Sequence, residues 1–187
     1  MATIRKMRPD DLKAVENVCR MTAGPVFQND PVLGYRLARM FSTYYARECY
    51  DSSFVLVDDS DTVVGYVLCE PDHKRFRKIF RKVDVPEIKK LDKKSGKQAW
   101  LFPIPYDFFG RKYPAHLHID ILDEYQSKGY GAKLMAALFE ELKKRNVRGV
   151  MLQADIHNEG AIRFYKRLGF KMLSTKMKTA TMAKNLL

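Results

Sequence analysis

The segment QSKGYG at residues 126–131 constrains this chain more than any other feature, because it joins an apolar segment to an amphipathic one. Gln126, Gly129 and Gly131 give the spacing Q-x-x-G-x-G. Glycine has no Cβ atom and tolerates positive φ, so successive backbone N–H groups can converge on one anion. The helix that follows would add its free N-terminal N–H groups and the positive end of its dipole. The pattern therefore predicts a loop that binds a diphosphate.

A second ordered block, NEGAIRFYKRLGF, spans residues 158–170. Asn158 is a good helix N-cap, and Gly169 suits the left-handed position that ends a helix. Apolar positions between them recur at helical spacing, so one face of the predicted helix is buried. That face carries Ala161, Ile162, Tyr165 and Leu168. Tyr165 is then either one more packing aromatic or a phenol with a chemical role.

The segment AHLHIDIL at residues 115–122 comes directly before the glycine loop and has the alternation of a strand. A period of two places His116, His118 and Asp120 on one face and the apolar residues on the other. Two histidines and a carboxylate on one strand face can supply a general base and a group that orients it. They can equally be polar groups that are satisfied inside the fold.

The rest of the pattern predicts a mixed sheet. Strands are expected at residues 2–8, 54–57 and 62–70 around an acidic turn, 147–154, 170–175 and 178–184. Helices are expected from Asp10 or Asp11, over 32–50 and over 131–146, whereas 24–31 reads as a loop by its Gly, Asn and Pro content. Strands interleaved with helices indicate an α/β fold, a central twisted mixed sheet with helices on both faces.

Residues 71–114 are too long for a hairpin loop and predict a basic and aromatic insert. From Lys74 to Lys97 eleven Lys or Arg stand against three acidic residues, a net +8 within a chain of net +12. A basic amphipathic helix is expected near 73–83, and the aromatic stretch 100–114 is suited to lining a pocket. The cations form either a solvated surface or a site for an acidic or phosphorylated acceptor or partner. Nucleic-acid binding has no recognised module in this sequence.

Composition indicates one globular domain over residues 1–187, with 46% hydrophobic residues. No apolar run approaches the roughly 18 residues that span a bilayer, and the N-terminus lacks a hydrophobic signal core. Cys19, Cys49 and Cys69 are widely spaced and odd in number, which favours buried thiols in a reducing compartment. We therefore expect a cytoplasmic protein with no membrane span and no metal site.

The two motif blocks resemble the GNAT superfamily of N-acetyltransferases. In that family a Q/R-x-x-G-x-G/A loop binds the pyrophosphate of acetyl-CoA, and an N-x(6)-Y-x(3)-GF helix follows the next strand. The resemblance is most specific over residues 115–170 and implies acetyl-CoA as cosubstrate. The implied cofactor-binding residues are Ile119, Ile121, Leu122, Gln126, Ser127, Lys128, Gly129, Tyr130, Gly131, Ala132, Lys133, Asn158, Ala161 and Tyr165.

The resemblance also implies catalytic roles. A tyrosine at the position of Tyr165 often protonates the leaving coenzyme A thiolate. A free amine has a pKa of ~10.4, so a base must take its proton at neutral pH. His116, His118 and Asp120 are the candidates, and a water relay is the alternative. The two histidines resemble the strand pair of arylalkylamine N-acetyltransferases, but their spacing to the glycine loop differs by one residue. A β-bulge would be needed to give them the same facing.

Within the superfamily, the long aromatic insert before AHLHIDILDEYQSKGYG resembles the acetyltransferase-like domain of O-GlcNAcase and its free-standing relatives. The implied function is transfer of an acetyl group to an amine of a small-molecule or protein acceptor, by direct attack on the thioester. The alternative is a protein of the same fold that binds acyl-CoA without efficient transfer. Monomer and homodimer both remain open.

Overall fold

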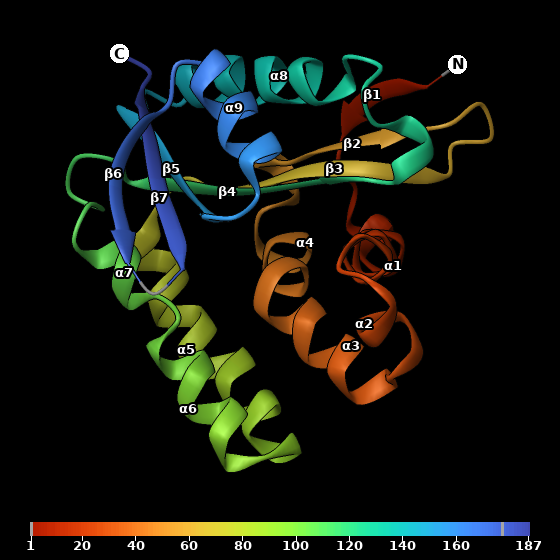
Figure 1. Ribbon diagram of the computed structural model, residues 1–187, viewed down its shortest axis with the longest axis vertical. Coiled ribbons are helices and arrows are strands. Elements are labelled where there is room, and N and C mark those ends of the chain that lie inside the picture. Colours follow the sequence, from red (N-terminus) through yellow and green to blue (C-terminus); the bar gives the residue numbers. More distant parts are fainter. Residues whose placement is uncertain (1, 177) are drawn as a thin grey trace.

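The computed structural model describes residues 2–176 and 178–187, and within them the backbone forms one seven-stranded mixed sheet (Figure 1). The strand order is β1-β2-β3-β4-β5-β7-β6, and neighbours are antiparallel except β4 and β5. The strands are β1 Thr3–Lys6, β2 Phe54–Val57, β3 Val63–Glu70, β4 Ala115–Ile121, β5 Gly149–Asp155, β6 Lys171–Lys176 and β7 Thr179–Asn185. The predicted mixed α/β fold is confirmed, and the strand ends differ from the predicted ones by one or two residues.

The centre of the sheet opens between β4 and β5. Their pairing is limited to Ala115 opposite Val150 and His116 opposite Met151. Beyond His116, β4 continues beside β3 as far as Ile121, while β5 continues beside β7. The two strands therefore stop exchanging hydrogen bonds toward their C-terminal ends, which leaves both ends with a free side.

Two helices cover one face of the sheet (Figure 1), α8 Tyr130–Lys144 and α9 Glu159–Arg167. The apolar stripe of α8 is wholly buried and comprises Leu134, Met135, Leu138 and Leu142. It packs with the apolar face of β4, where Leu117, Ile119 and Ile121 point toward the same core. The predicted helix at 131–146 is confirmed within two residues.

The other face is covered by the N-terminal helices and the insert (Figure 1). The N-terminal group begins with α1 Leu12–Thr22 after a 3₁₀ turn at Pro9–Asp11. The helix predicted over 32–50 is present as α3 Pro31–Ala38, a π-helical stretch Arg39–Thr43 and α4 Tyr44–Glu48. Tyr44 and Tyr45 from α4 are fully buried against β3 and α5. This side of the sheet is therefore rich in aromatic rings.

The loop predicted at 24–31 is wrong, because a short helix, α2 Pro25–Asn29, occupies it. Gly24 precedes α2 with φ +98°, and Pro25 fills the first helical position, where a missing N–H is harmless. Asp30 then caps α3 by accepting hydrogen bonds from the N–H groups of Val32 and Leu33. The residues that indicate a loop here are the caps of two successive helices.

The insert is helical, with α5 His73–Leu91, α6 Lys93–Leu101 and α7 Ile104–Asp107. The predicted basic helix at 73–83 is confirmed but runs eight residues further, through Pro86. Tertiary contacts support the extension, because Ile88 is buried and Asp84 forms ion pairs with Arg39 and Arg47. The insert therefore builds part of the core and is no loose appendage.

The composition of the aromatic stretch 100–114 predicts that it lines a pocket. In the structure, part of the stretch is buried and part is exposed. Tyr106 and Tyr113 are buried in a small core with Met151. Phe108 is 79% exposed and borders, with Arg111 and Lys112, a shallow hollow of about 490 Å³. The stretch therefore contributes to packing at one end and to an open surface at the other.

Cys19, Cys49 and Cys69 are free and buried, as predicted. No helix in residues 2–176 or 178–187 is long and apolar enough to cross a membrane.

Candidate active site

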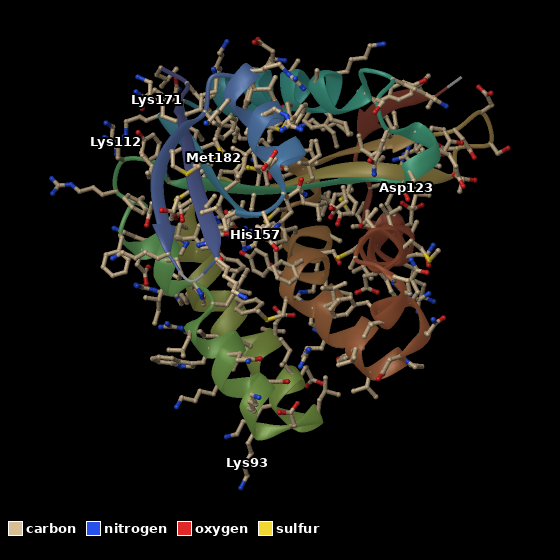
Figure 2. All side chains as sticks on the ribbon, viewed as in Figure 1. Lys93, Lys112, Asp123, His157, Lys171 and Met182 are labelled. Carbon is tan, nitrogen blue, oxygen red and sulfur yellow. The ribbon has the colours of Figure 1, made fainter. Side chains whose placement is uncertain are left out.

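A cleft of about 760 Å³ lies where β4 and β5 have separated. It is bounded by the C-terminal half of β4, the glycine loop, the first turn of α8 and one side of α9. Figure 2 labels Asp123 and His157, which lie just beyond the ends of β4 and β5. The predicted cofactor-binding residues that line the cleft are Ile119, Ile121, Gln126, Ser127, Gly129, Gly131, Ala132, Asn158, Ala161 and Tyr165.

Gln126 holds the glycine loop in place. Its side-chain Nε2 donates to the carbonyl oxygen of Ile121 at 2.8 Å and to Oδ1 of Asp123 at 2.9 Å. Ser127 and Gly129 both have positive φ, +59° and +82°, so the chain turns sharply into α8. The turn therefore depends on one glycine and on one serine that accepts a rare conformation.

The first turn of α8 supplies the free N–H groups. Its first internal hydrogen bond runs from the N–H of Lys133 to the carbonyl of Gly129 at 3.3 Å. The N–H groups of Tyr130, Gly131 and Ala132 precede that bond and are the ones that helix geometry leaves without an internal acceptor. The N–H of Lys133 is not one of these free donors, because the helix itself uses it.

Gly131 is required for a different reason from the one predicted. Its φ is not positive, so the expected conformational freedom is not used there. A Cβ atom at this position would instead lie 3.2 Å from Cζ of Phe164 and 3.8 Å from Cδ1 of Ile121. Gly131 thus lets α8 approach α9 closely at the floor of the cleft.

Four predicted cofactor-binding residues do not line the cleft: Leu122, Lys128, Tyr130 and Lys133. Leu122 packs into the cores, and the hydroxyl of Tyr130 accepts a hydrogen bond from the N–H of Ala2. The ammonium groups of Lys128 and Lys133 lie over the rings of Tyr125 and Tyr130. These lysines give the loop positive charge without forming the cleft wall.

The cleft also contains residues that the sequence analysis missed, Thr22 from α1 and Phe164 and Arg167 from α9. Arg167 is an exposed cation on the wall and complements an anionic guest. The sequence predicted it poorly, because apolar periodicity identifies the buried face of a helix and Arg167 lies on the exposed face. Thr22 is remote in sequence and has no local signal.

Tyr165 is 8% exposed and lines the cleft from α9. Burial, and to a smaller extent the charge of Asp120, raise the pKa of its phenol well above the usual value. The group therefore keeps its proton at neutral pH. In this environment it can donate a proton or a hydrogen bond but cannot act as a base.

Asp120 lines the same cleft from β4 and is half-buried. Burial raises its pKa, while a hydrogen bond from the hydroxyl of Tyr66 opposes that rise. A carboxylate with a raised pKa is a better proton acceptor than an ordinary aspartate. Asp120 and Tyr165 thus bring a proton acceptor and a proton donor into one cleft.

The two strand histidines lie deeper. His116, His118 and Asp120 do share one face of β4, as predicted, and β3 pairs with β4 in continuous register over Gly65 to Glu70. No β-bulge interrupts this register, so the one-residue difference from the spacing of the arylalkylamine N-acetyltransferase histidines is not corrected along this pairing. His118 accepts or donates a hydrogen bond with the hydroxyl of Tyr45 at 3.1 Å, and burial lowers its pKa to about 4. Neither histidine belongs to the cleft wall.

Asn158 has the predicted N-cap role, since its Oδ1 accepts from the N–H of Ala161 at 2.9 Å. Its side chain also borders the cleft. Within residues 2–176 and 178–187 no group of three or more His, Cys, Asp or Glu could hold a metal ion. Free helix N–H groups, nearby lysines and Arg167 fit a phosphorylated organic guest such as coenzyme A.

Comparison with known proteins supports this fit. The model of the acetyltransferase (GNAT) family matches residues 23–170. N-alpha-acetyltransferase 30 of Schizosaccharomyces pombe is 27% identical over 127 residues, which are 68% of this chain and 62% of that protein. The matched region thus spans less than two thirds of that relative's length.

Solved structures of the same fold cover the whole chain. The crystal structure of SsHAT has a TM-score of 0.85 and 30% identity, covering 100% of this chain and 98% of that one. The PaiA N-acetyltransferase of Thermoplasma acidophilum, solved with coenzyme A, has a TM-score of 0.62 and 15% identity, covering 99% of both chains. The prediction of a GNAT-fold acetyltransferase that uses acetyl-CoA is confirmed.

The finer resemblance to the acetyltransferase-like domain of O-GlcNAcase is not borne out. The relatives by sequence include N-alpha-acetyltransferase 30 and an N-acetyltransferase of Methanocaldococcus jannaschii, which is 41% identical over 58 residues, or 30% of this chain. The insert, which suggested O-GlcNAcase, forms α5, α6 and α7 and lies outside the glycine loop and α9, which carry the family motifs. A long aromatic insert between two strands, here β3 and β4, can arise in more than one branch of a fold family.

Proposed function

The chain belongs to the acetyltransferase (GNAT) family, and from that premise we propose that it acetylates the N-terminal α-amino group of a peptide or protein. The observation that carries the proposal is that Gly131 and Ala132 from the first turn of α8, Tyr165 from α9 and Asp120 from β4 line one cleft. The named activity of the S. pombe relative supports an α-amine acceptor.

Acetyl-CoA would lie with its pyrophosphate at the first turn of α8. The N–H groups of Tyr130, Gly131 and Ala132 are the donors, and the helix dipole favours the negative charge there. Arg167 is the cation of the cleft wall that can approach the phosphates. The pantetheine arm would then run along the free side of β4 toward Asp120, with Asn158 on the opposite wall.

The reaction needs three events at the thioester. The neutral amine attacks the carbonyl carbon, the C–N bond forms, and the C–S bond breaks. Tyr165 gives its phenolic proton to the thiolate as it leaves, which its raised pKa permits only through close positioning. The nitrogen, which carries one proton too many once the C–N bond has formed, then loses that proton and Tyr165 regains one, so the phenol is restored and one proton is released overall. Asp120, directly or through one water, takes the proton that the ammonium must lose before it attacks.

The alternative function is acyl-CoA binding without efficient transfer. The positions of the two histidines favour it, because neither lines the cleft, and His116 is fully buried while His118 is partly exposed. Asp120 argues against it, since a carboxylate at the wall can serve as the base in their place. The proposed enzyme therefore does not require a histidine base.

Release of coenzyme A thiol from acetyl-CoA tests the proposal. The acceptors are a set of short peptides that differ in their first two residues, the same peptides blocked at the α-amine, and a panel of polyamines, aminosugars and arylalkylamines. We expect thiol release with free peptides and none with the blocked ones. Transfer to a small amine alone, or to lysine side chains of the blocked peptides, would refute the α-amine acceptor. Acetyl-CoA binding without any thiol release would support the alternative.

A further inference from the structure

Three polar rings from separate elements meet beneath the sheet, on the face opposite α8. They are His73 at the start of α5, Tyr106 in α7 and His116 in β4, and their exposed fractions are 2%, 0% and 0%. The ring of His116 lies 4.7 Å from that of Tyr106 and 5.7 Å from that of His73, measured between centroids. The insert thus closes a buried polar cluster over the strand that leads to the cleft.

The cluster is short of hydrogen-bond partners. Across residues 2–176 and 178–187, no protein group pairs with either ring nitrogen of His116, with Nδ1 of His73 or with the hydroxyl of Tyr106. A buried polar atom without a partner is costly, and natural proteins usually satisfy such atoms with ordered water. A buried water makes about three hydrogen bonds, which the atoms gathered here can supply.

One side of the cluster leads to the cleft. The ring of Tyr45 lies 5.5 Å from that of His116, and its hydroxyl is 3.1 Å from Nε2 of His118. His118 stands two residues before Asp120 on the same face of β4, and Asp120 borders the cleft. Asp120, His118, Tyr45 and His116 therefore succeed one another on this face of the sheet, with a direct hydrogen bond between His118 and Tyr45. The steps from Asp120 to His118 and from Tyr45 to His116 would need water.

The other side leads to the surface. Nε2 of His73 is 2.6 Å from Oδ1 of Asp107, whose side chain is 30% exposed and also binds Arg77 at 2.9 Å. His73 and Arg77 lower the pKa of that carboxyl against the effect of burial, so it is ionised and accepts from Nε2. Nδ1 of His73 is then a free acceptor that faces the cluster.

We propose that ordered water pairs with the unsatisfied polar atoms of His73, Tyr106 and His116, and that this hydrated cluster conducts the acceptor's proton from Asp120 through His118 and Tyr45 to Asp107. The proposal rests on the proposed function. An ammonium acceptor and acetyl-CoA give an amide, a thiol and one proton, so each turnover must release one proton. While both substrates fill the cleft, they cover Asp120 on that side, and an exit through the protein remains.

Each group on the route can accept a proton at one atom and give up another. Neutral histidine does so through its two ring nitrogens, and tyrosine and water do so through oxygen. Burial lowers the pKa of both His116 and His118, so neither histidine retains the proton that passes. The three side chains of the cluster are positioning residues, because they act on the substrate only through others.

Asp107→Asn and Tyr106→Phe test the route with little risk to the fold, since one is at the surface and the other keeps its ring. His116→Phe is the third variant, and Asp61→Asn, at a surface aspartate paired with Arg5 and Arg8, is the matched control. We expect kcat to fall about tenfold or more in Asp107→Asn, Tyr106→Phe and His116→Phe, with unchanged KM for acetyl-CoA and a larger solvent deuterium isotope effect. The control should keep both values.

A high-resolution crystal structure of the wild-type protein supplies a readout besides activity. Water within hydrogen-bond distance of His116 and Tyr106 is expected, with one site lost in Tyr106→Phe. A dry cluster would overturn the proposal, as would wild-type kcat and isotope effect in Asp107→Asn and Tyr106→Phe. If the wild-type protein is active and these variants are too, only the route fails. If the wild-type protein transfers no acetyl group, the proposed function and the route fail together.

Discussion

Burial changes the pKa values of the two residues to which we assign the chemistry, Tyr165 and Asp120. Tyr165 keeps its phenolic proton at neutral pH, as any tyrosine does, and burial beside Asp120 raises its pKa further. Burial also raises the pKa of Asp120, which makes its carboxylate a stronger base. An exposed aspartate would be a weaker base, whereas an exposed tyrosine would still keep its proton at neutral pH. The pair is therefore assigned opposite roles, proton donor and proton acceptor, by its environment.

Tyr165→Phe should lower kcat by about ten- to several-hundred-fold, because general acids typically contribute ~10²–10⁴. KM for acetyl-CoA should change little, since the ring and its packing remain. Steady-state kinetics with a peptide acceptor measures both constants. Tyr125→Phe is the control, a second phenol on the cleft wall near the glycine loop, and it should keep kcat. Full activity in Tyr165→Phe would show that the ring only packs and that water protonates the thiolate.

At the scale of elements, the site is produced by a defect in the sheet. β4 and β5 pair only through Ala115 and His116, and the cleft begins where that pairing stops. The glycine loop then turns the chain so that α8 begins beside the opening. Helix N–H groups and strand side chains thus reach the same space from different elements.

Gly131→Val should weaken acetyl-CoA binding at least tenfold, because the added methyl groups enter the floor of the cleft. Some loss of stability is also expected, since a Cβ atom there already meets Phe164 at 3.2 Å. Calorimetric titration with coenzyme A gives the affinity, and thermal unfolding shows whether the variant folds. Ala136→Val, on the exposed side of the same helix, is the matched control. Unchanged affinity in a folded Gly131→Val protein would remove the loop from the binding site.

The basic insert is an element with a separate role. Lys93 lies at the tip of the insert, far from α8 and the glycine loop (Figure 2). Some cations of the insert have partners, as Arg75 has in Glu70 and Lys90 in Glu87, so its free charge is smaller than its composition suggests. The remaining lysines face solvent along α5 and α6.

Replacing Lys89, Lys93, Lys94 and Lys97 by Glu should leave acetyl-CoA affinity within about twofold, because these side chains are remote from the cleft and salt screens charges over ~10 Å. If the surface binds acidic acceptors, kcat/KM for peptides with acidic residues should fall and lose its salt dependence. A large loss of coenzyme A affinity would instead assign the cluster to the cofactor's phosphates. No change in either quantity would leave the lysines as a solvated surface.

At the scale of the molecule, buried neutral histidines make stability depend on pH. Burial lowers the pKa of His73, His116 and His118 in the folded protein, while in the unfolded chain each is near 6.5. The unfolded state then binds more protons below that pH, so stability is full above about pH 6.5 and is lost as the pH falls.

The free energy of unfolding should therefore decrease between pH 6.5 and 4, by up to about 1.4 kcal/mol per pH unit for each of these histidines. Urea unfolding at several pH values measures it. His118→Gln, whose amide can still bind the hydroxyl of Tyr45, should make the slope shallower. His157→Gln, at an exposed position, should leave it unchanged. If the free energy of unfolding of the wild-type protein did not change with pH over this range, the histidines could not be buried in their neutral form.

Short sequence patterns predicted those features of the fold and site that depend on residues close together in the sequence. The glycine spacing around Gly129, the cap at Asn158 and the facing of His116, His118 and Asp120 all follow from short periods in the sequence. Contacts between distant segments could not be predicted this way. Arg167, Thr22 and Phe164 reach the cleft only after α1, α8 and α9 have packed. The cluster of His73, Tyr106 and His116 likewise forms only when the insert folds back onto β4.

Helix signals were also ambiguous where turn residues serve as caps. Gly24, Pro25 and Asp30 indicate a loop by composition, yet each has a place at a helix end. Pro86 suggests an end to α5, but the buried pairs of Asp84 and the burial of Ile88 continue the helix. In α2 and in the second half of α5, tertiary packing therefore outweighs local propensity.

The position of bound coenzyme A tests the account most directly. A crystal structure of the complex should place pyrophosphate oxygens at hydrogen-bond distance from the N–H groups of Tyr130, Gly131 and Ala132. The sulfur should lie between Tyr165 and Asp120, with the tyrosine hydroxyl roughly 3–3.5 Å from it. A coenzyme bound elsewhere, or a sulfur that neither residue can reach, would contradict the proposed site and the roles of both residues.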